Sequence, residues 1–191
     1  MAKRKIKNIF EDWTPEWKFV RGEGKWNYFV EPDDYDNWGT QLYGKEVEEL
    51  IPELEEIRDK AVEFVKEQGK EVTNVNPVYK EDKEGNKYIN FRKKKYDEET
   101  TPPKLYNVSG DEITGEFNQP VGGGSTLRVK TMIKPYYIPA SKTVGVSTKL
   151  IAVQIIKNNF NGTSAGFSDE SGEDNPPFDF DSSKATESDE Y

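Results

Sequence analysis

The chain has 191 residues, a length that suits one compact domain followed by a tail. It contains no cysteine and no histidine, which excludes disulfides, thiol nucleophiles, imidazole bases and ordinary zinc sites. The net charge of -9 lies mostly at the carboxyl end, because residues 168–191 hold nine of the 36 acids and one of the 27 bases.

The amino-terminal segment, Met1 to Ile9, is a basic arm that includes Lys3. Two interpretations are open: a solubilising terminus, or an arm that contacts phosphates. The segment lacks the apolar core of a signal peptide, and the longest apolar run, Leu150 to Ile156, is far below the ~20 residues that cross a bilayer. We therefore expect a cytoplasmic protein without a membrane segment.

Aromatic residues are concentrated between Trp13 and Trp38, a region that holds all four tryptophans. This density in short, glycine-punctuated segments predicts twisted strands, most clearly Lys25 to Val30. We expect most of these rings in the core; the alternative for any one tryptophan is a surface on which a base stacks. Asp33, Asp34 and Asp36 leave a metal-dependent phosphoesterase open, although they lack a catalytic spacing and a base.

A helix is predicted from Pro52 to Gln68. Proline suits the first helical turn, and the residue before it avoids the helical region, so Pro52 marks the start and Gly69 the stop. Apolar residues repeat at helical spacing, at Leu54, Ile57, Ala61, Phe64 and Val65. The pattern indicates a packing helix that covers a barrel and carries no chemistry.

Val72 to Tyr79 and Lys87 to Lys95 are predicted to form a strand pair around the turn signal at Glu84 to Asn86. The basic face of the second strand is either a solvated edge that blocks aggregation or part of a phosphate-binding groove. Its apolar and basic side chains fall on opposite faces: Ile89 and Phe91 on one, Arg92 and Lys94 on the other.

Thr100 to Gln119 is expected to be mostly loop, with one short strand at Lys104 to Val108. Gly122 to Gly124 should form a tight turn or bulge, since it lacks the spacing and the Lys-Ser/Thr ending of a phosphate loop. The strand that follows alternates between an apolar and a cationic face: Leu127, Val129 and Thr131 on one, Arg128, Lys130 and Met132 on the other.

Three motifs carry a resemblance to a known family: GGGSTLRVK at Gly122 to Lys130, KPYY at Lys134 to Tyr137, and TVGVSTKL at Thr143 to Leu150. Together they resemble the single-stranded DNA-binding proteins of short-tailed lytic bacteriophages of the T-seven-like group. The resemblance implies a mainly β chain with an OB-fold, a five-stranded Greek-key barrel with one capping α-helix. The expected domain covers residues 1–160, and a disordered acidic tail covers 161–191.

The resemblance also implies a non-enzymatic protein that binds single-stranded DNA without sequence preference during phage replication, recombination and strand annealing, with no cofactor or metal. A polyanionic tail can occupy a basic groove until DNA displaces it. In the family, the tail contacts the phage DNA polymerase and the primase-helicase and supports a homodimer, a role that would fall here on Asp189, Glu190 and Tyr191. The expected location is the cytoplasm of the infected bacterial host. An OB-type module that binds RNA or another protein is the alternative.

The predicted DNA-binding residues combine phosphate-attracting cations with rings on which bases can stack. They are Lys3, Arg92, Lys94, Arg128, Lys130, Lys134, Tyr136 and Tyr137. The family motif supports Arg128, Lys130 and Tyr136, whereas Arg92 and Lys94 depend on the strand pattern. We expect these residues to meet on a common outer wall of the barrel.

Overall fold

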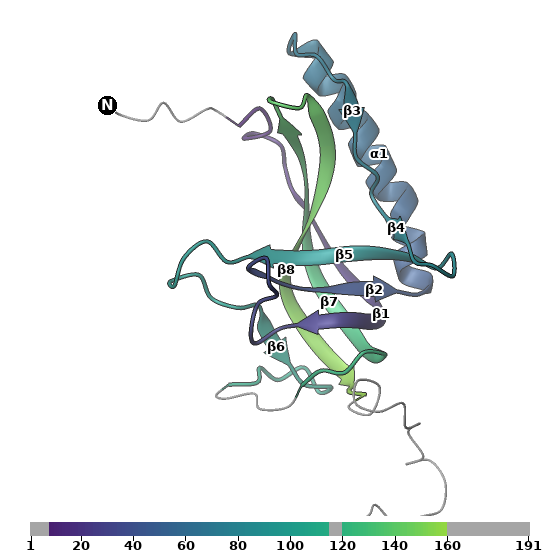
Figure 1. Ribbon diagram of the computed structural model, residues 1–191, viewed down its shortest axis with the longest axis vertical. Helices are drawn as coiled ribbons and strands as arrows, with labels where there is room; N and C mark the ends of the chain where they lie inside the picture. The colour runs from purple at the N-terminus through teal and green to yellow at the C-terminus, as the bar shows by residue number, and fades with distance from the viewer. Residues whose placement is uncertain (1–7, 115–119, 160–191) are drawn as a thin grey trace, which may run out of the picture.

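The computed structural model describes residues 8–114 and 120–159. Within them lie one helix and eight strands (Figure 1). Their bounds are β1 Glu16–Tyr28, β2 Asn37–Tyr43, α1 Lys45–Glu67, β3 Asn74–Val75, β4 Lys80–Glu81, β5 Lys87–Lys94, β6 Lys104–Tyr106, β7 Ser125–Ile138 and β8 Thr143–Lys157. Lys3 and the whole predicted tail, with Asp189, Glu190 and Tyr191, lie outside the described residues.

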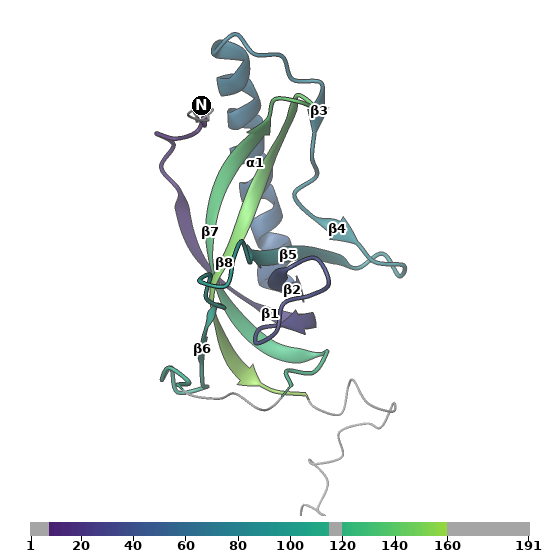
Figure 2. The same cartoon turned by 60° about the vertical axis from the view of Figure 1, so that its left-hand side comes forward.

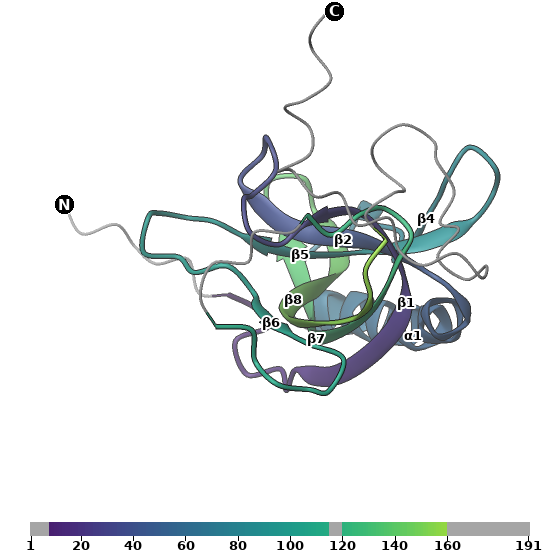
Figure 3. The ribbon, with the colours of Figure 1, turned by 90° about the horizontal axis from the view of Figure 1, so that it is seen from below.

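Five of the strands close into a barrel. Hydrogen-bonded neighbours follow the order β1-β2-β5-β8-β7 and return to β1, since β7 pairs with both β1 and β8. Neighbours in this ring are antiparallel except β5 and β8, which are parallel. Seen from below in Figure 3, β2 and β5 lie on one side of the ring and β7 on the other, and β1 runs from β7 to β2. The predicted five-stranded OB-type barrel is confirmed.

The barrel interior is filled by the apolar side of each strand. Leu127 and Val129 of β7, and Ile89 and Phe91 of β5, are buried, as the alternation of side chains predicted. Fully burying one such side chain contributes about 1.5–3 kcal/mol to stability. Thr131 is buried too, and its hydroxyl donates to the carbonyl of Lys149 at 2.9 Å, which removes the cost of an unpaired polar group.

α1 begins at Lys45, well before the predicted start at Pro52, so that prediction is wrong. The apolar stripe of Val47, Leu50 and Leu54 is buried and runs through the proline position. Pro52 itself lies on the exposed side of the helix. Water can therefore solvate the carbonyl that a proline leaves without an N–H donor. Burial of the stripe outweighs the local cost of the proline.

The carboxyl-terminal end of α1 agrees with the prediction. The helix ends at Glu67, and Gly69 follows with φ of 74°, a left-handed conformation that glycine adopts without strain. Figures 1 and 2 show α1 running beside the parts of β7 and β8 that extend beyond the barrel. In the part of the chain that the structure describes, no helix is both long and apolar enough to cross a bilayer.

The hairpin before β5 forms, but the prediction that Val72 to Tyr79 is its other strand is wrong. Its turn is present, and the carboxylate of Asp82 accepts the N–H groups of Glu84 and Asn86, each at 2.9 Å. The partner strand is only β4, whereas most of Val72 to Tyr79 is irregular and its residues Asn74–Val75 pair with β8 instead. At this level β7 pairs with one edge of β8, and β3 pairs with the other. The predicted short strand after Thr100 is confirmed as β6, which also pairs with β8.

The aromatic residues of the first 40 positions divide between core and surface. Phe29 and Trp38 are buried, but Trp17, Phe19 and Trp26 are 53%, 58% and 67% exposed. The expectation that most of these rings lie in the core is therefore wrong. β1 points its large rings outward and fills the barrel with smaller side chains.

Candidate nucleic-acid interface

An outward-facing layer of cations and rings lies where β1 pairs with β7. Antiparallel pairing places Phe19 opposite Lys130 and Arg21 opposite Arg128. The pair between them, Val20 and Val129, is buried, which fixes the other residues on the outside. We call this surface the β1–β7 wall; it comprises Trp17, Phe19 and Arg21 of β1 and Arg128, Lys130, Met132 and Lys134 of β7.

The cations of the β1–β7 wall lie against its rings. The guanidinium carbon of Arg128 is 5.0 Å from the ring centroid of Phe19. Lys130 Nζ is 5.4 Å from the ring centroid of Trp17 and 5.7 Å from that of Phe19. Such contacts contribute about 0.5–1 kcal/mol each at exposed sites. They keep charge and flat apolar surface at the same place, as a strand of phosphates and unpaired bases requires.

A groove continues the wall toward β6 and β8. It has a volume of about 400 Å³ and is lined by Phe19, Arg128 and Lys130 from the wall, with Lys104 and Tyr106 from β6. Lys104 Nζ lies 3.4 Å from a carboxylate oxygen of Glu112, so part of its charge is already neutralised. The groove adds a further ring, that of Tyr106, to the cationic side of β7.

The two tyrosines of the KPYY motif point to opposite sides of β7. Tyr136 lies on the same side as Arg128, Lys130 and Lys134 by the alternation of the strand. Its ring lies directly over Gly145, where an added Cβ would come within 2.3 Å of the hydroxyl, and Asn76 donates to that hydroxyl at 2.6 Å. Tyr136 is therefore a rigidly held ring at the far end of this row of cations.

Tyr137 faces the helix side instead. Its ring packs against the small apolar cluster that contains Phe10, Ala61 and Val144, and its hydroxyl donates to the carbonyl of Glu71 at 2.8 Å. The structure thus brings Arg128, Lys130, Lys134 and Tyr136 together and separates Tyr137 from them.

Arg92 and Lys94 belong to a second outer surface, on β2 and β5. Arg92 pairs with Gly39, and Lys94 Nζ donates to the carbonyl of Tyr35 in the β1–β2 loop. Figure 3 shows β2 and β5 on the far side of the barrel from β7. The expectation of one common wall is wrong for these two residues, because the ring order of the strands places them on a different side. Exposed Tyr28 and Tyr35 supply rings to this second surface.

The two surfaces meet where β8 passes β5. Lys149 of β8 pairs with Met132 of the β1–β7 wall on one side and with Arg92 on the other. Burial lowers the pKa of Lys93, and the positive charge of Lys149 lowers it further. The second of these causes is the one that bears on binding, because the positive charge of Lys149 favours an anion at this junction.

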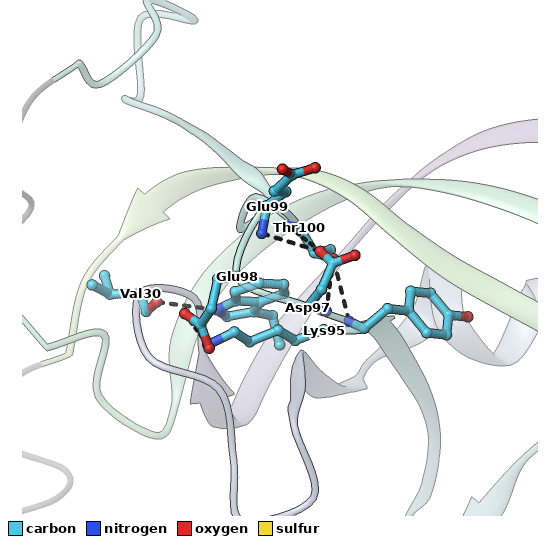
Figure 4. A network of polar contacts seen from close by, with 8 residues as sticks. Val30, Lys95, Asp97, Glu98, Glu99 and Thr100 are labelled. Atoms are coloured by element: carbon cyan, nitrogen blue, oxygen red, sulfur yellow. Dashed lines mark hydrogen bonds and ion pairs between the residues drawn. The ribbon is translucent and has the colours of Figure 1, made fainter.

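The loop after β5 is ordered around one carboxylate, as Figure 4 shows. Asp97 accepts the N–H groups of Glu99 and Thr100 at 3.1 and 2.9 Å and the hydroxyl of Thr100 at 2.8 Å. These hydrogen bonds, led by that of the hydroxyl, lower the pKa of Asp97. The N–H of Lys95 donates to the carbonyl of Asp36 at 2.8 Å, so this loop is attached to the β1–β2 loop beside it.

Two solved structures share this architecture. The single-stranded DNA-binding protein gp2.5 of bacteriophage T7 aligns with a TM-score of 0.63 at 15% sequence identity, over 86% of this chain and 97% of that one. The single-stranded DNA-binding protein of bacteriophage Enc34 aligns with a TM-score of 0.51 at 16% identity, over 81% of this chain and 88% of that one. The chain has the fold of these phage proteins. No family model and no curated protein matches the sequence.

Within this shared fold, Asp33 of the β1–β2 loop has a structural role. The carboxylate of Asp33 accepts the N–H groups of Tyr35 and Asn37, each at 2.9 Å, and so shapes the turn. Across residues 8–114 and 120–159, no group of three or more acidic side chains is placed to share a metal ion.

Sequence reasoning missed Trp17, Phe19 and Arg21 as site residues. Their signal was present, since all three occupy alternate positions of the segment WKFVR. The rings were assigned to the core because large aromatics are usually buried there. The pairing of β1 with β7 was needed to show that this side of β1 faces outward.

Proposed function

We propose that the protein binds single-stranded DNA without sequence preference, with the β1–β7 wall as its main contact surface. The observation that carries the proposal is the interleaving of the exposed rings of Trp17 and Phe19 with Arg128 and Lys130 on one side of the barrel. The fold it shares with two phage proteins, each described as a single-stranded DNA-binding protein, supports the proposal.

Binding by this surface would combine two kinds of contact. Arg21, Arg128, Lys130 and Lys134 would neutralise phosphates and release their counterions, which makes binding strong at low salt and independent of sequence. The exposed rings would stack on bases, and every base has a face on which a ring can stack. Tyr136 would add a further rigid ring at the end of the row. The junction at Lys149 would let a longer strand reach Arg92.

We further propose that the protein acts in phage DNA replication, recombination and strand annealing, in the cytoplasm of the infected host. The acidic tail would compete with DNA for the cationic surfaces and would contact the phage DNA polymerase and the primase-helicase through Asp189, Glu190 and Tyr191, with a homodimer as the working form. The charge of residues 168–191, a net of -8 against a net of -1 for the rest, supports the competition. Lys3 would extend the cationic surface from the amino-terminal arm.

Competition between nucleic acids tests the proposal. The full chain is titrated into a labelled oligo(dT), and unlabelled oligo(dT), duplex DNA and single-stranded RNA of equal length are added as competitors. We expect oligo(dT) to displace the label at the lowest concentration. Stronger displacement by RNA than by oligo(dT) would favour the RNA-binding alternative, because it would require a group that recognises the 2'-hydroxyl. Failure to bind any single strand would overturn the proposal.

A further inference from the structure

Trp26 is the most exposed tryptophan and has an unfavourable backbone conformation. It is 67% exposed, and its φ of 54° lies in the left-handed region that non-glycine residues rarely adopt. The pairing of β1 with β2 shows the cause: Lys25 pairs with Gln41 and Tyr28 with Gly39, so two residues of β1 lie opposite one of β2. This is a β-bulge, and the left-handed position of such a bulge is usually a glycine.

The side chain of Asn27 fixes the bulge through hydrogen bonds to neighbouring segments. The side-chain amide of Asn27 donates to the carbonyls of Val121 and Gly122 at 3.3 and 3.0 Å, and its oxygen accepts the hydroxyl of Thr40 at 2.6 Å. The triple-glycine turn is thereby attached to the bulge, next to Trp26. The tryptophan ring does not fill the core and is not needed to close the turn. A bulky ring at a position suited to glycine therefore calls for another explanation.

The ring borders two hollows. One, of about 200 Å³, lies toward β2 and β5 and also contains Tyr28, Tyr35 and Arg92. The other, of about 770 Å³, lies toward the triple-glycine turn and contains Lys25, Tyr28 and Gly123. Each hollow has one cation at its border and open space beside the indole. A flat group in either hollow would therefore lie beside Trp26.

We propose that Trp26 inserts between two neighbouring bases of a bound DNA strand, with one base held in each hollow. The inference deepens the proposed function and rests on it. β1 belongs to both outer surfaces of the barrel, so a strand that follows the β1–β7 wall past Arg21 reaches Trp26 before it reaches Arg92. Lys25 and Arg92 would each take one of the phosphates that flank the separated bases.

The polar groups around the hollows agree with bases rather than phosphates. Asp33 and Asp34 border the smaller hollow and Glu23 the larger, and their charge would repel a phosphate placed inside. The amide side chain of Asn90 also borders the smaller hollow and matches the donor and acceptor groups on base edges. The sugar-phosphate backbone would therefore run along the outer rim, with the bases pointing inward past the indole.

Replacement of Trp26 by glycine separates the ring from the bulge. Trp26→Gly keeps the left-handed backbone conformation, so its melting temperature should stay within a few degrees of the starting protein or rise. Its affinity for a labelled oligo(dT) should fall roughly 30-fold or more, since stacking contributes ~1–3 kcal/mol per base, two bases lie against the ring, and 1.4 kcal/mol corresponds to tenfold. Trp26→Phe, which retains a smaller ring, should recover most of the loss.

Tyr96→Ala is the matched control, because Tyr96 is 84% exposed and borders neither hollow. It should bind oligo(dT) within about twofold of the starting protein. The slope of affinity against salt should be the same for Trp26→Gly as for the starting protein, because no cation is removed. In a Trp17→Phe protein, where Trp26 is the remaining strongly exposed indole of the described residues, oligo(dT) should quench the tryptophan fluorescence.

Two results would overturn the proposal while leaving the proposed function intact. The first is a folded Trp26→Gly protein that binds oligo(dT) as tightly as the starting protein. The second is a change from dimer to monomer on sedimentation with unchanged DNA affinity, which would assign the ring to a contact between two copies of the chain. A starting protein that binds no oligonucleotide would instead refute the proposed function itself.

Discussion

Removing Arg128 and Lys130 together should reduce the salt dependence of DNA binding by a predictable amount. Arg128→Ala/Lys130→Ala removes the two cations that contact the rings of the β1–β7 wall. Each phosphate neutralised on a single strand contributes about 0.7 to the slope of log affinity against log salt. For an oligo(dT) short enough to cover the β1–β7 wall alone, the four contacts from Arg21, Arg128, Lys130 and Lys134 give a slope of about -3, and two contacts give about -1.4.

These slopes predict a large difference between the two proteins in how much DNA affinity is lost as the salt concentration rises. Between 50 and 200 mM salt, the starting protein should lose about 50-fold in affinity and the double variant about 7-fold. The assay is fluorescence anisotropy of a labelled oligo(dT) at four or five salt concentrations, with circular dichroism to confirm folding. The two side chains are exposed or half-buried, so their removal should leave the barrel intact.

The matched control removes the same charge from a different place. Lys45→Ala/Lys66→Ala takes two exposed lysines from α1, away from the β1–β7 wall. It has the same net charge as the first double variant and should keep the slope of the starting protein. Equal slopes for both double variants would show that net charge, rather than the wall, controls binding, and would refute the reasoning.

Three further predictions concern other parts of the chain. Pro52→Ala should raise stability by about 1–3 kcal/mol, measured by thermal melting, because the carbonyl of Glu48 gains a helical partner; a lower melting temperature would show that the proline is needed where it is. Gly145→Ala should cost about 1–3 kcal/mol in the same assay, since the new Cβ would displace the ring of Tyr136; full stability would mean that the ring is not held there. Deleting residues 168–191 should tighten oligo(dT) binding at low salt by removing a competitor of net charge -8, and weaker binding by the folded truncation would refute self-competition.

The strands that could be predicted are those whose two faces differ in chemistry. β7 alternates small or apolar residues with Arg128, Lys130 and Lys134, and β5 alternates Ile89 and Phe91 with basic residues. The alternation alone assigns the inner and outer sides of such strands. The cationic half of the β1–β7 wall was therefore visible in the sequence.

The aromatic half was not visible, for a reason that the structure makes clear. In β1, Lys18 faces α1 and its Nζ lies 2.7 Å from a carboxylate oxygen of Glu53, a contact that raises the pKa of Lys18. A lysine thus occupies the side of β1 covered by the helix, while Trp17 and Phe19 occupy the outer side. Hydrophobicity alone predicts the reverse arrangement. The position of the helix and the pairing of β1 with β7, both long-range features, resolve it.

The separation of Arg92 from Arg128 was also beyond local patterns. Both residues occupy outward positions of basic strands, and the sequence gives no measure of how many strands lie between them. The ring order β1-β2-β5-β8-β7 decides this, and that order depends on which strands pair across long stretches of chain. The predicted start of α1 was wrong for the opposite reason. The local preference of proline for the first helical turn was outweighed by burial of the apolar stripe that runs past Pro52.

The closure of the barrel has a mechanical consequence. Among the described residues, β5 and β8 are aligned at one pair only, Arg92 and Lys149, with the hydroxyl of Thr148 donating to the carbonyl of Asn90 at 2.6 Å beside it. Two like charges therefore flank the joint with the fewest main-chain contacts, and they repel each other across it. A polyanion that crossed this joint would cancel the repulsion. Amide protons of Arg92 and its neighbours should then exchange with solvent more slowly in the presence of DNA than in its absence, even though no new strand pairing forms.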